Sequence, residues 1–127
     1  MRYLSTVAGV VLGLIFVMSS VVVLFHLAPA PPIPEGTPMA MFMGALGSTG
    51  YLTFIKICEL IGGVLVAIPR TRNFGLLVLG PIIINILAFH VFIANGEGLF
   101  SPLLIAIVVL ALYLLWEGRK GFAGLRN

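Results

Sequence analysis

Long apolar runs, interrupted by short polar or proline-rich segments, dominate the pattern of this chain. Four of these runs are long enough to cross a bilayer as helices. They cover about residues 3–27, 51–68, 74–94 and 102–116. Each is predicted to be a helix, because lipid offers the backbone no hydrogen-bond partner and no strand-like alternation is present. The pattern predicts an all-α, integral membrane four-helix bundle in which residues 1–127 form a single transmembrane domain.

A proline-rich loop, residues 28–38, separates the first two runs. Its prolines favour an extended path. Thr37 followed by Pro38 is typical of a helix N-cap and a first helical residue. The apolar stretch Met39–Leu46 that follows is too short to span a bilayer, and the segment Gly47–Gly50 ends it. We therefore expect a short interfacial or re-entrant helix after the proline-rich loop.

Composition supports a membrane protein and excludes several other classes. The chain is 61% hydrophobic and 9% charged, whereas a soluble domain carries roughly a quarter charged residues. The net charge of +3 does not indicate a nucleic-acid partner, because the basic residues do not form one patch. Cys58 is the single cysteine, so no internal disulfide is expected. The first run is far longer than the roughly 7–15 residues of a signal-peptide core, and we expect it to be retained.

The distribution of basic residues predicts the orientation. They fall at the N-terminus, in the middle loop and at the C-terminus: Arg2, Arg70, Arg72, Arg119, Lys120 and Arg126. The other two loops carry Glu35 and Glu97 and no lysine or arginine. Since cytoplasmic loops carry an excess of basic residues, we expect a multi-pass protein with both termini in the cytoplasm.

Two charged residues, Lys56 and Glu59, lie inside the second apolar run. A charge at that depth costs roughly 2.5–3.5 kcal/mol, so it is seldom left unpaired. Their spacing of three places them on one helical face, where they can pair, although Lys56 could instead extend to the outer interface. Gly62 and Gly63 follow on a face suited to close helix contact, which would turn Glu59 into the bundle.

Three further polar side chains are expected on the outer side of the membrane, together with Lys56 and Glu59. They are Asn85 and His90 in the third run and His26 at the end of the first. Together with Lys56 and Glu59 they form a candidate ligand-binding or structural polar cluster. Asn85 favours an interhelical hydrogen bond over a ligand contact. His90 is a candidate pH-sensitive or cofactor-binding group, and His26 is expected to be an interfacial histidine. The pattern assigns no catalytic residue and no metal-ligand set.

Four short segments carry a resemblance to a known family. They are FMGAL at 42–46, TGYL at 49–52, CELIGG at 58–63 and PIIINILAFH at 81–90. In this order and spacing, and with the proline-rich loop before them, the chain resembles the DoxX family of small bacterial four-helix membrane proteins. The resemblance covers nearly the whole chain. It matches the family's glutamate to Glu59 and the asparagine and histidine of its third helix to Asn85 and His90.

The resemblance implies a bacterial inner-membrane location and a redox association, since relatives are linked to quinone-dependent sulfur oxidation and to oxidoreductase complexes. We expect a small accessory subunit of a larger membrane complex. The alternative is a self-contained redox protein that binds a quinone or lipid-like ligand near Glu59, Asn85 and His90. No intrinsic cofactor is expected. The expected partners are membrane lipids and either other membrane subunits or further copies, contacted through small-residue faces at Gly9/Gly13 and Gly62/Gly63.

Overall fold

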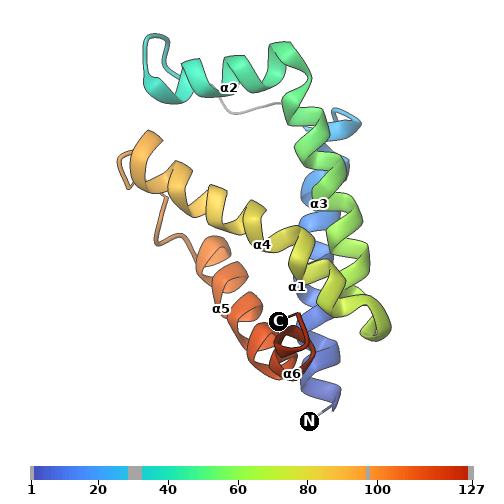
Figure 1. The fold of residues 1–127 in the computed structure, drawn as a ribbon. Helices are drawn as coiled ribbons and strands as arrows, with labels where there is room; N and C mark the ends of the chain where they lie inside the picture. Colours follow the sequence, from blue (N-terminus) through green and yellow to red (C-terminus); the bar gives the residue numbers. More distant parts are fainter. Residues whose placement is uncertain (1, 29–32, 97, 126–127) are drawn as a thin grey trace.

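The protein is all-α throughout the ranges that its computed structural model describes, residues 2–28, 33–96 and 98–125 (Figure 1). Its long helices are α1 (Arg2–Leu24), α3 (Tyr51–Ala67), α4 (Arg72–Ala88) and α5 (Pro102–Glu117). Its shorter elements are α2 (Pro38–Thr49), the 3₁₀ turn η1 (Pro69–Thr71), the π-helical turn η2 (Phe89–Ile93) and α6 (Arg119–Ala123). The predicted all-α class is confirmed.

Local sequence signals set several of the helix boundaries. The Thr37 hydroxyl accepts a hydrogen bond from the Ala40 amide at 3.2 Å, so the predicted cap begins α2. Ser101 caps α5 in the same way, ahead of a proline at the first helical position. The helix α3 ends at Ala67, one residue before the predicted limit. Ile68 is extended (φ −91°, ψ 123°) because the following proline disfavours helical backbone in the residue before it.

The first predicted helix ends earlier than expected, at Leu24 rather than Leu27. His26 adopts a left-handed backbone, with φ 53°. The Leu27 amide then donates to the Val22 carbonyl at 3.0 Å, and the His26 amide donates to the Val23 carbonyl at 3.4 Å. This pair of bonds is a Schellman motif, which satisfies free carbonyls at a helix end. A histidine therefore takes the position that glycine usually occupies.

The third predicted helix, residues 74–94, is observed as two elements. The helix α4 begins two residues earlier, at Arg72, and continues through Pro81 to Ala88. From Phe89 the chain widens into the π-helical turn η2, in which the Ala94 amide donates to the Phe89 carbonyl at 2.9 Å. Such turns are uncommon and are found frequently at functional sites.

Each long helix packs against the next long helix along the chain, and the buried core lies toward one end of the molecule. The helix α1 runs beside α3, α3 packs on α4, and α5 contacts both α4 and α1. The start of α1 and the helix α6 lie at one end, whereas α2 lies at the other (Figure 1). The buried core comes from α1, α3, α4 and α5: Ala8, Leu12, Phe16, Val66, Leu76, Leu79, Ile83, Ile107, Ala111 and Leu114. No residue of α2 is buried.

Glycines allow the closest of these helix contacts. A Cβ placed on Gly62 would lie 2.8 Å from the Leu79 side chain of α4. One placed on Gly9 would lie 2.8 Å from the Val66 carbonyl of α3. These small-residue faces, which we expected to serve partners, are therefore filled by helices of the same chain.

Two helical segments are long and apolar enough to cross a membrane, Tyr3–Leu24 and Pro69–Ile93. The pair α2 and α3 would provide a third if it were counted as one span, but its axis bends by 82°. The apolar helix α5 is shorter, with 16 residues. The described residues thus contain two or three candidate membrane spans.

Candidate ligand-binding cleft

A cavity lies between α3 and α4, and residues of α2 also line it. Figure 1 shows the arrangement of these three helices. The helix α2 turns sharply away from α3, and α4 leaves α3 in a different direction. The walls formed by α3 and α4 therefore diverge and leave a space between them. The resulting space has a volume of about 1360 Å³. We call it the lateral cleft and define it by one apolar residue from each contributing element: Val22, Leu46, Ile55, Ile82, Phe89 and Ile107.

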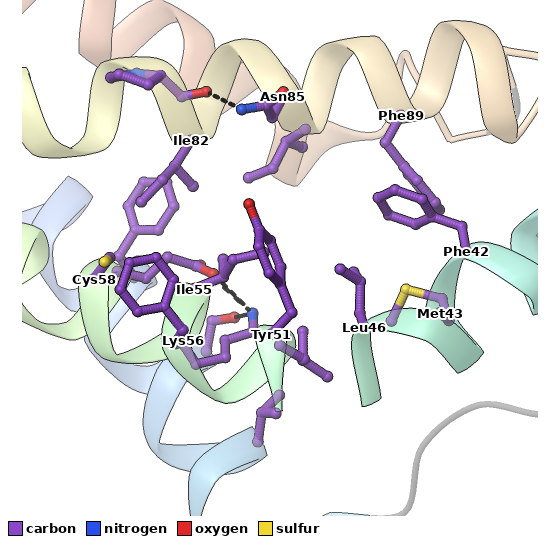
Figure 2. Close-up of a pocket in the computed structure, with 18 of the residues that line it drawn as sticks. Phe42, Met43, Leu46, Tyr51, Ile55, Lys56, Cys58, Ile82, Asn85 and Phe89 are labelled. Carbon is purple, nitrogen blue, oxygen red and sulfur yellow. Dashed lines mark hydrogen bonds and ion pairs between the residues drawn. The ribbon is translucent and has the colours of Figure 1, made fainter. Parts of the chain in front are cut away.

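An aromatic contact bridges the cleft at the end formed by α2 and η2. The rings of Phe42 on α2 and Phe89 on η2 have centroids 5.2 Å apart and are tilted by 39°. Met43 and Leu46 line the same wall, and Figure 2 shows them facing the space between α2 and α4. This end of the cleft is therefore closed by apolar side chains rather than by backbone.

The predicted pairing of Lys56 and Glu59 is present on the α3 wall (Figure 2). The Lys56 Nζ lies 3.3 Å from Oε2 and 3.5 Å from Oε1 of Glu59. It also donates to the Ser19 hydroxyl of α1 at 3.1 Å. Glu59 is 4% exposed, and the Lys56 side chain is 16% exposed. Lys56 thus turns inward to two partners, Glu59 on its own helix and Ser19 on α1.

Asn85 and His90 line the opposite wall of the cleft, and each is bonded to its own helix. The Asn85 amide donates to the Pro81 carbonyl at 3.0 Å, so the interhelical bond that we expected is replaced by one within α4 (Figure 2). This leaves the Asn85 Oδ1 available as an acceptor.

The His90 ring makes one hydrogen bond and an edge-on contact with the Phe89 ring, with the ring centroids 5.4 Å apart. Its Nδ1 lies 2.8 Å from the Ile86 carbonyl. A carbonyl can only accept, so Nδ1 carries the proton and Nε2 of the neutral ring is the acceptor.

His26 stands apart from the other predicted residues. It is exposed, ends α1 and does not line the cleft. The structure therefore brings four of the five predicted polar residues to one cavity. Among the described residues, no group of three or more histidine, cysteine or carboxylate side chains is close enough to hold a metal ion.

The sequence analysis missed three hydroxyl-bearing residues of the cleft: Ser19, Thr49 and Tyr51. Ser19 receives the Lys56 hydrogen bond, and its signal was the Ser19–Ser20 pair inside an otherwise apolar run. Tyr51, at the first position of α3, projects its ring into the cleft with the hydroxyl directed toward α4 (Figure 2). Tyrosine is common at membrane interfaces, so a tyrosine at the start of an apolar run does not by itself indicate a ligand site.

These observations define a small helical protein with at least two helices able to cross a membrane. Its cavity is lined mainly by apolar side chains, with a few polar groups on the walls. No protein-family model matches the chain, and no solved structure matches it. The chain is similar to "Uncharacterized protein YwoB" of Bacillus subtilis (strain 168), with 36% identity over 75 residues. The aligned segment covers 59% of this chain and 47% of that protein. The chain thus spans about half the length of the curated relative it matches.

Proposed function

We propose that the chain is a multi-pass protein of a bacterial inner membrane, with α1, α3, α4 together with η2, and α5 as its four spans. The ring of contacts from α1 through α3 and α4 to α5 and back to α1 supports a four-helix bundle. At 1.5 Å per residue, α3 and α5 reach about 25 Å and 24 Å, which is shorter than the roughly 30 Å hydrocarbon core. Local thinning of the bilayer accommodates such short spans at modest cost.

The same proposal places both termini in the cytoplasm. The start of α1 and the basic helix α6 lie at one end of the molecule, and α2 lies at the other (Figure 1). The turn η1, with Arg70, joins α3 and α4 at the ends farther from α2. Basic segments at one end and α2 at the opposite end support the positive-inside orientation. The helix α2 then lies at the outer interface, above the lateral cleft.

We infer that the lateral cleft binds one amphiphilic molecule, a quinone or another lipid-like ligand. The observation that carries this inference is an apolar cavity of about 1360 Å³ with polar groups on its two facing walls. Ligand sites commonly combine an apolar lining with a few placed polar groups. The Tyr51 hydroxyl and the Lys56 ammonium can donate to a carbonyl of the ligand. Asn85 and His90 offer acceptors to a hydroxyl, as in the reduced form of a quinone.

The resemblance to DoxX proteins extends this proposal to a redox-associated role. In it, the chain is a small accessory subunit of a larger membrane complex and holds the quinone or lipid for that complex. The electron-carrying chemistry then belongs to the bound ligand or to another subunit. The alternative, a self-contained DoxX-type redox protein, uses the same cleft and differs in needing no other subunit.

Extraction of the purified protein tests the ligand. The full chain is isolated in mild detergent, and bound quinones and lipids are quantified by mass spectrometry. We expect one amphiphile at a constant ratio to protein. Ala45→Phe, which adds a ring inside the cleft, should lower that ratio at unchanged thermal stability. Val109→Phe, on the exposed face of α5, is the matched control and should retain the ligand. Equal retention in both variants, or no defined amphiphile in the wild type, would reject the proposal.

A further inference from the structure

A second, smaller cavity lies at the end of the molecule opposite α2. It is enclosed by the start of α1, the junction of η1 with α4, and the end of α5. Its volume is about 210 Å³. We call it the basal pocket, and its lining includes Ser5, Arg70, Arg72, Asn73, Leu114 and Glu117. It shares no lining residue with the lateral cleft.

Arg72 is fixed in place at this pocket. Its Nε donates to the Val66 carbonyl at 3.1 Å. The guanidinium lies across Gly9 of α1, where an added Cβ would be 2.5 Å from Nε and 3.0 Å from Cζ. Its position is therefore set by α1 and α3 before any ligand is present.

The hydrogen-bonding capacity of Arg72 is largely unused. A guanidinium carries five N–H donors, and the bond to Val66 uses one of them. Its Nη2 is buried and has no partner among the described residues. Arg72 is thus a preset cation among the residues that line this cavity, which favours an anionic ligand.

The other lining groups favour a phosphate. Arg70 brings a second guanidinium, so the lining carries two cations and one carboxylate, that of Glu117. The Asn73 side chain donates to the Gly118 carbonyl at 3.4 Å, which ties the start of α4 to the end of α5 across the pocket. Guanidinium forks match the geometry of phosphate oxygens and bind them through short, charge-assisted hydrogen bonds.

We propose that the basal pocket binds the phosphate group of an anionic phospholipid from the cytoplasmic leaflet. Its volume suits a headgroup phosphate and not an acyl chain. In the orientation proposed above, the pocket lies at the depth of the inner-leaflet headgroups, where anionic lipids and basic residues meet. The assignment to a lipid rests on that orientation, whereas the affinity for phosphate rests on the pocket alone. The site is independent of the lateral cleft and of the ligand there.

The test uses the full chain, stripped of lipid in a neutral detergent, with binding followed by native mass spectrometry. The probes are phosphatidylglycerol, a diacylglycerol that lacks the phosphate, and inorganic phosphate alone. Phosphatidylglycerol should bind and the diacylglycerol should not. Arg70→Gln should weaken the binding of phosphatidylglycerol about tenfold, the scale of a lost charge-assisted bond. Glu117→Gln should strengthen it, because the opposing carboxylate is gone.

Lys120→Gln is the matched control, since it removes the same charge from α6, outside the pocket. It should leave the affinity for phosphatidylglycerol unchanged. Arg72→Gln should abolish binding, and if that variant fails to fold, Arg70→Gln and Glu117→Gln still decide the question. Equal losses of affinity for phosphatidylglycerol in Arg70→Gln and Lys120→Gln would show that the lipid does not bind at the basal pocket. Inorganic phosphate binding as tightly as the lipid would overturn the lipid assignment. Neither result depends on what occupies the lateral cleft.

Discussion

Gly13 of α1 and Gly63 of α3 face each other with no room for a side chain between them. A Cβ placed on Gly13 would lie 2.5 Å from the Gly63 carbonyl oxygen. One placed on Gly63 would lie 2.9 Å from the Gly13 carbonyl oxygen. The two backbones are therefore in direct contact, and this contact fixes the distance between the two helices that carry Ser19 and Lys56.

Enlarging this contact should destabilise the protein. For Gly63→Val we expect a loss of about 1–3 kcal/mol, because added methyl groups in a tight contact force the backbones apart. Thermal unfolding in detergent measures the loss. Gly44→Ala in α2 is the control, since nothing lies within 4 Å of a Cβ there, and its melting temperature should not fall. A wild-type melting temperature for Gly63→Val would mean that α1 and α3 are not in backbone contact.

Breaking the buried ion pair should be more harmful than removing a side chain from the lipid face. Glu59→Ala leaves the Lys56 ammonium in the cleft with only Ser19 as a partner. Loss of one partner of a buried pair costs about 3–5 kcal/mol. Adding Lys56→Ala should partly restore stability, since no unpaired charge then remains. Unfolding of the single and double variants in detergent gives the comparison.

Val109→Ala is the control for this series, because Val109 is exposed on α5. It should unfold close to the wild type. If Glu59→Ala unfolds at the same temperature as Val109→Ala, with ligand content unchanged, then Glu59 is an incidental polar residue.

Removing the Tyr51 hydroxyl should weaken ligand retention and leave the fold intact. In Tyr51→Phe the ring stays in the cleft, but a donor to the ligand's polar group is lost. A neutral hydrogen bond contributes about 0.5–1.5 kcal/mol, so a loss of a few-fold in retained quinone or lipid is expected. Tyr3→Phe, at a residue 90% exposed and outside the cleft, should have no effect. Unchanged retention in Tyr51→Phe would remove Tyr51 from the site.

The proposed orientation is tested with reporter fusions. A reporter protein fused after Asn127 should be active only if it is of a kind that functions in the cytoplasm. One inserted between Glu35 and Gly36, in the loop before α2, should be active only if it works outside. The physical reason is the excess of arginine and lysine at the end of the molecule opposite α2. A cytoplasmic signal from the Glu35 loop would reverse the orientation.

The proposed accessory role makes two linked predictions about the isolated and native protein. The purified chain should show no haem, flavin or iron–sulfur absorption band, because in this role the electron carrier is supplied by a ligand or another subunit. In native membranes it should migrate within a much larger assembly on blue-native gels. A monomer carrying a stoichiometric chromophore would instead support the self-contained redox protein.

Local signals predicted most of the helix positions. Thr37–Pro38 predicted a helix start because capping is decided within one turn of chain, and Ser101–Pro102 has the same pattern. The burial of Glu59 followed from the glycines beside it, since they allow close approach of neighbouring helices. The early end of α1 was missed. The sequence does not distinguish a histidine with a left-handed backbone, such as His26, from a helical histidine.

The cleft itself could not be predicted, because it depends on how helices diverge. The 82° bend between α2 and α3 follows from Gly50, whose left-handed backbone (φ 81°) is both the C-cap of one helix and the N-cap of the next. Sequence spacing predicted the pairing of Lys56 with Glu59, but it did not predict the partners of the other polar residues. Asn85 was expected to bond another helix, and it bonds the carbonyl one turn earlier.

The placement of the ion pair within a single turn of α3 has a consequence for biogenesis in the membrane arrangement proposed above. Lys56 and Glu59 belong to the same helix, so neutralisation does not wait for tertiary assembly. The second apolar segment can leave the insertion machinery as a helix whose two charges already neutralise each other. Only the bond from Lys56 to Ser19 requires α1 to have docked. Helix insertion and bundle association are thereby separated into two steps, and a defect in Ser19 would affect only the second.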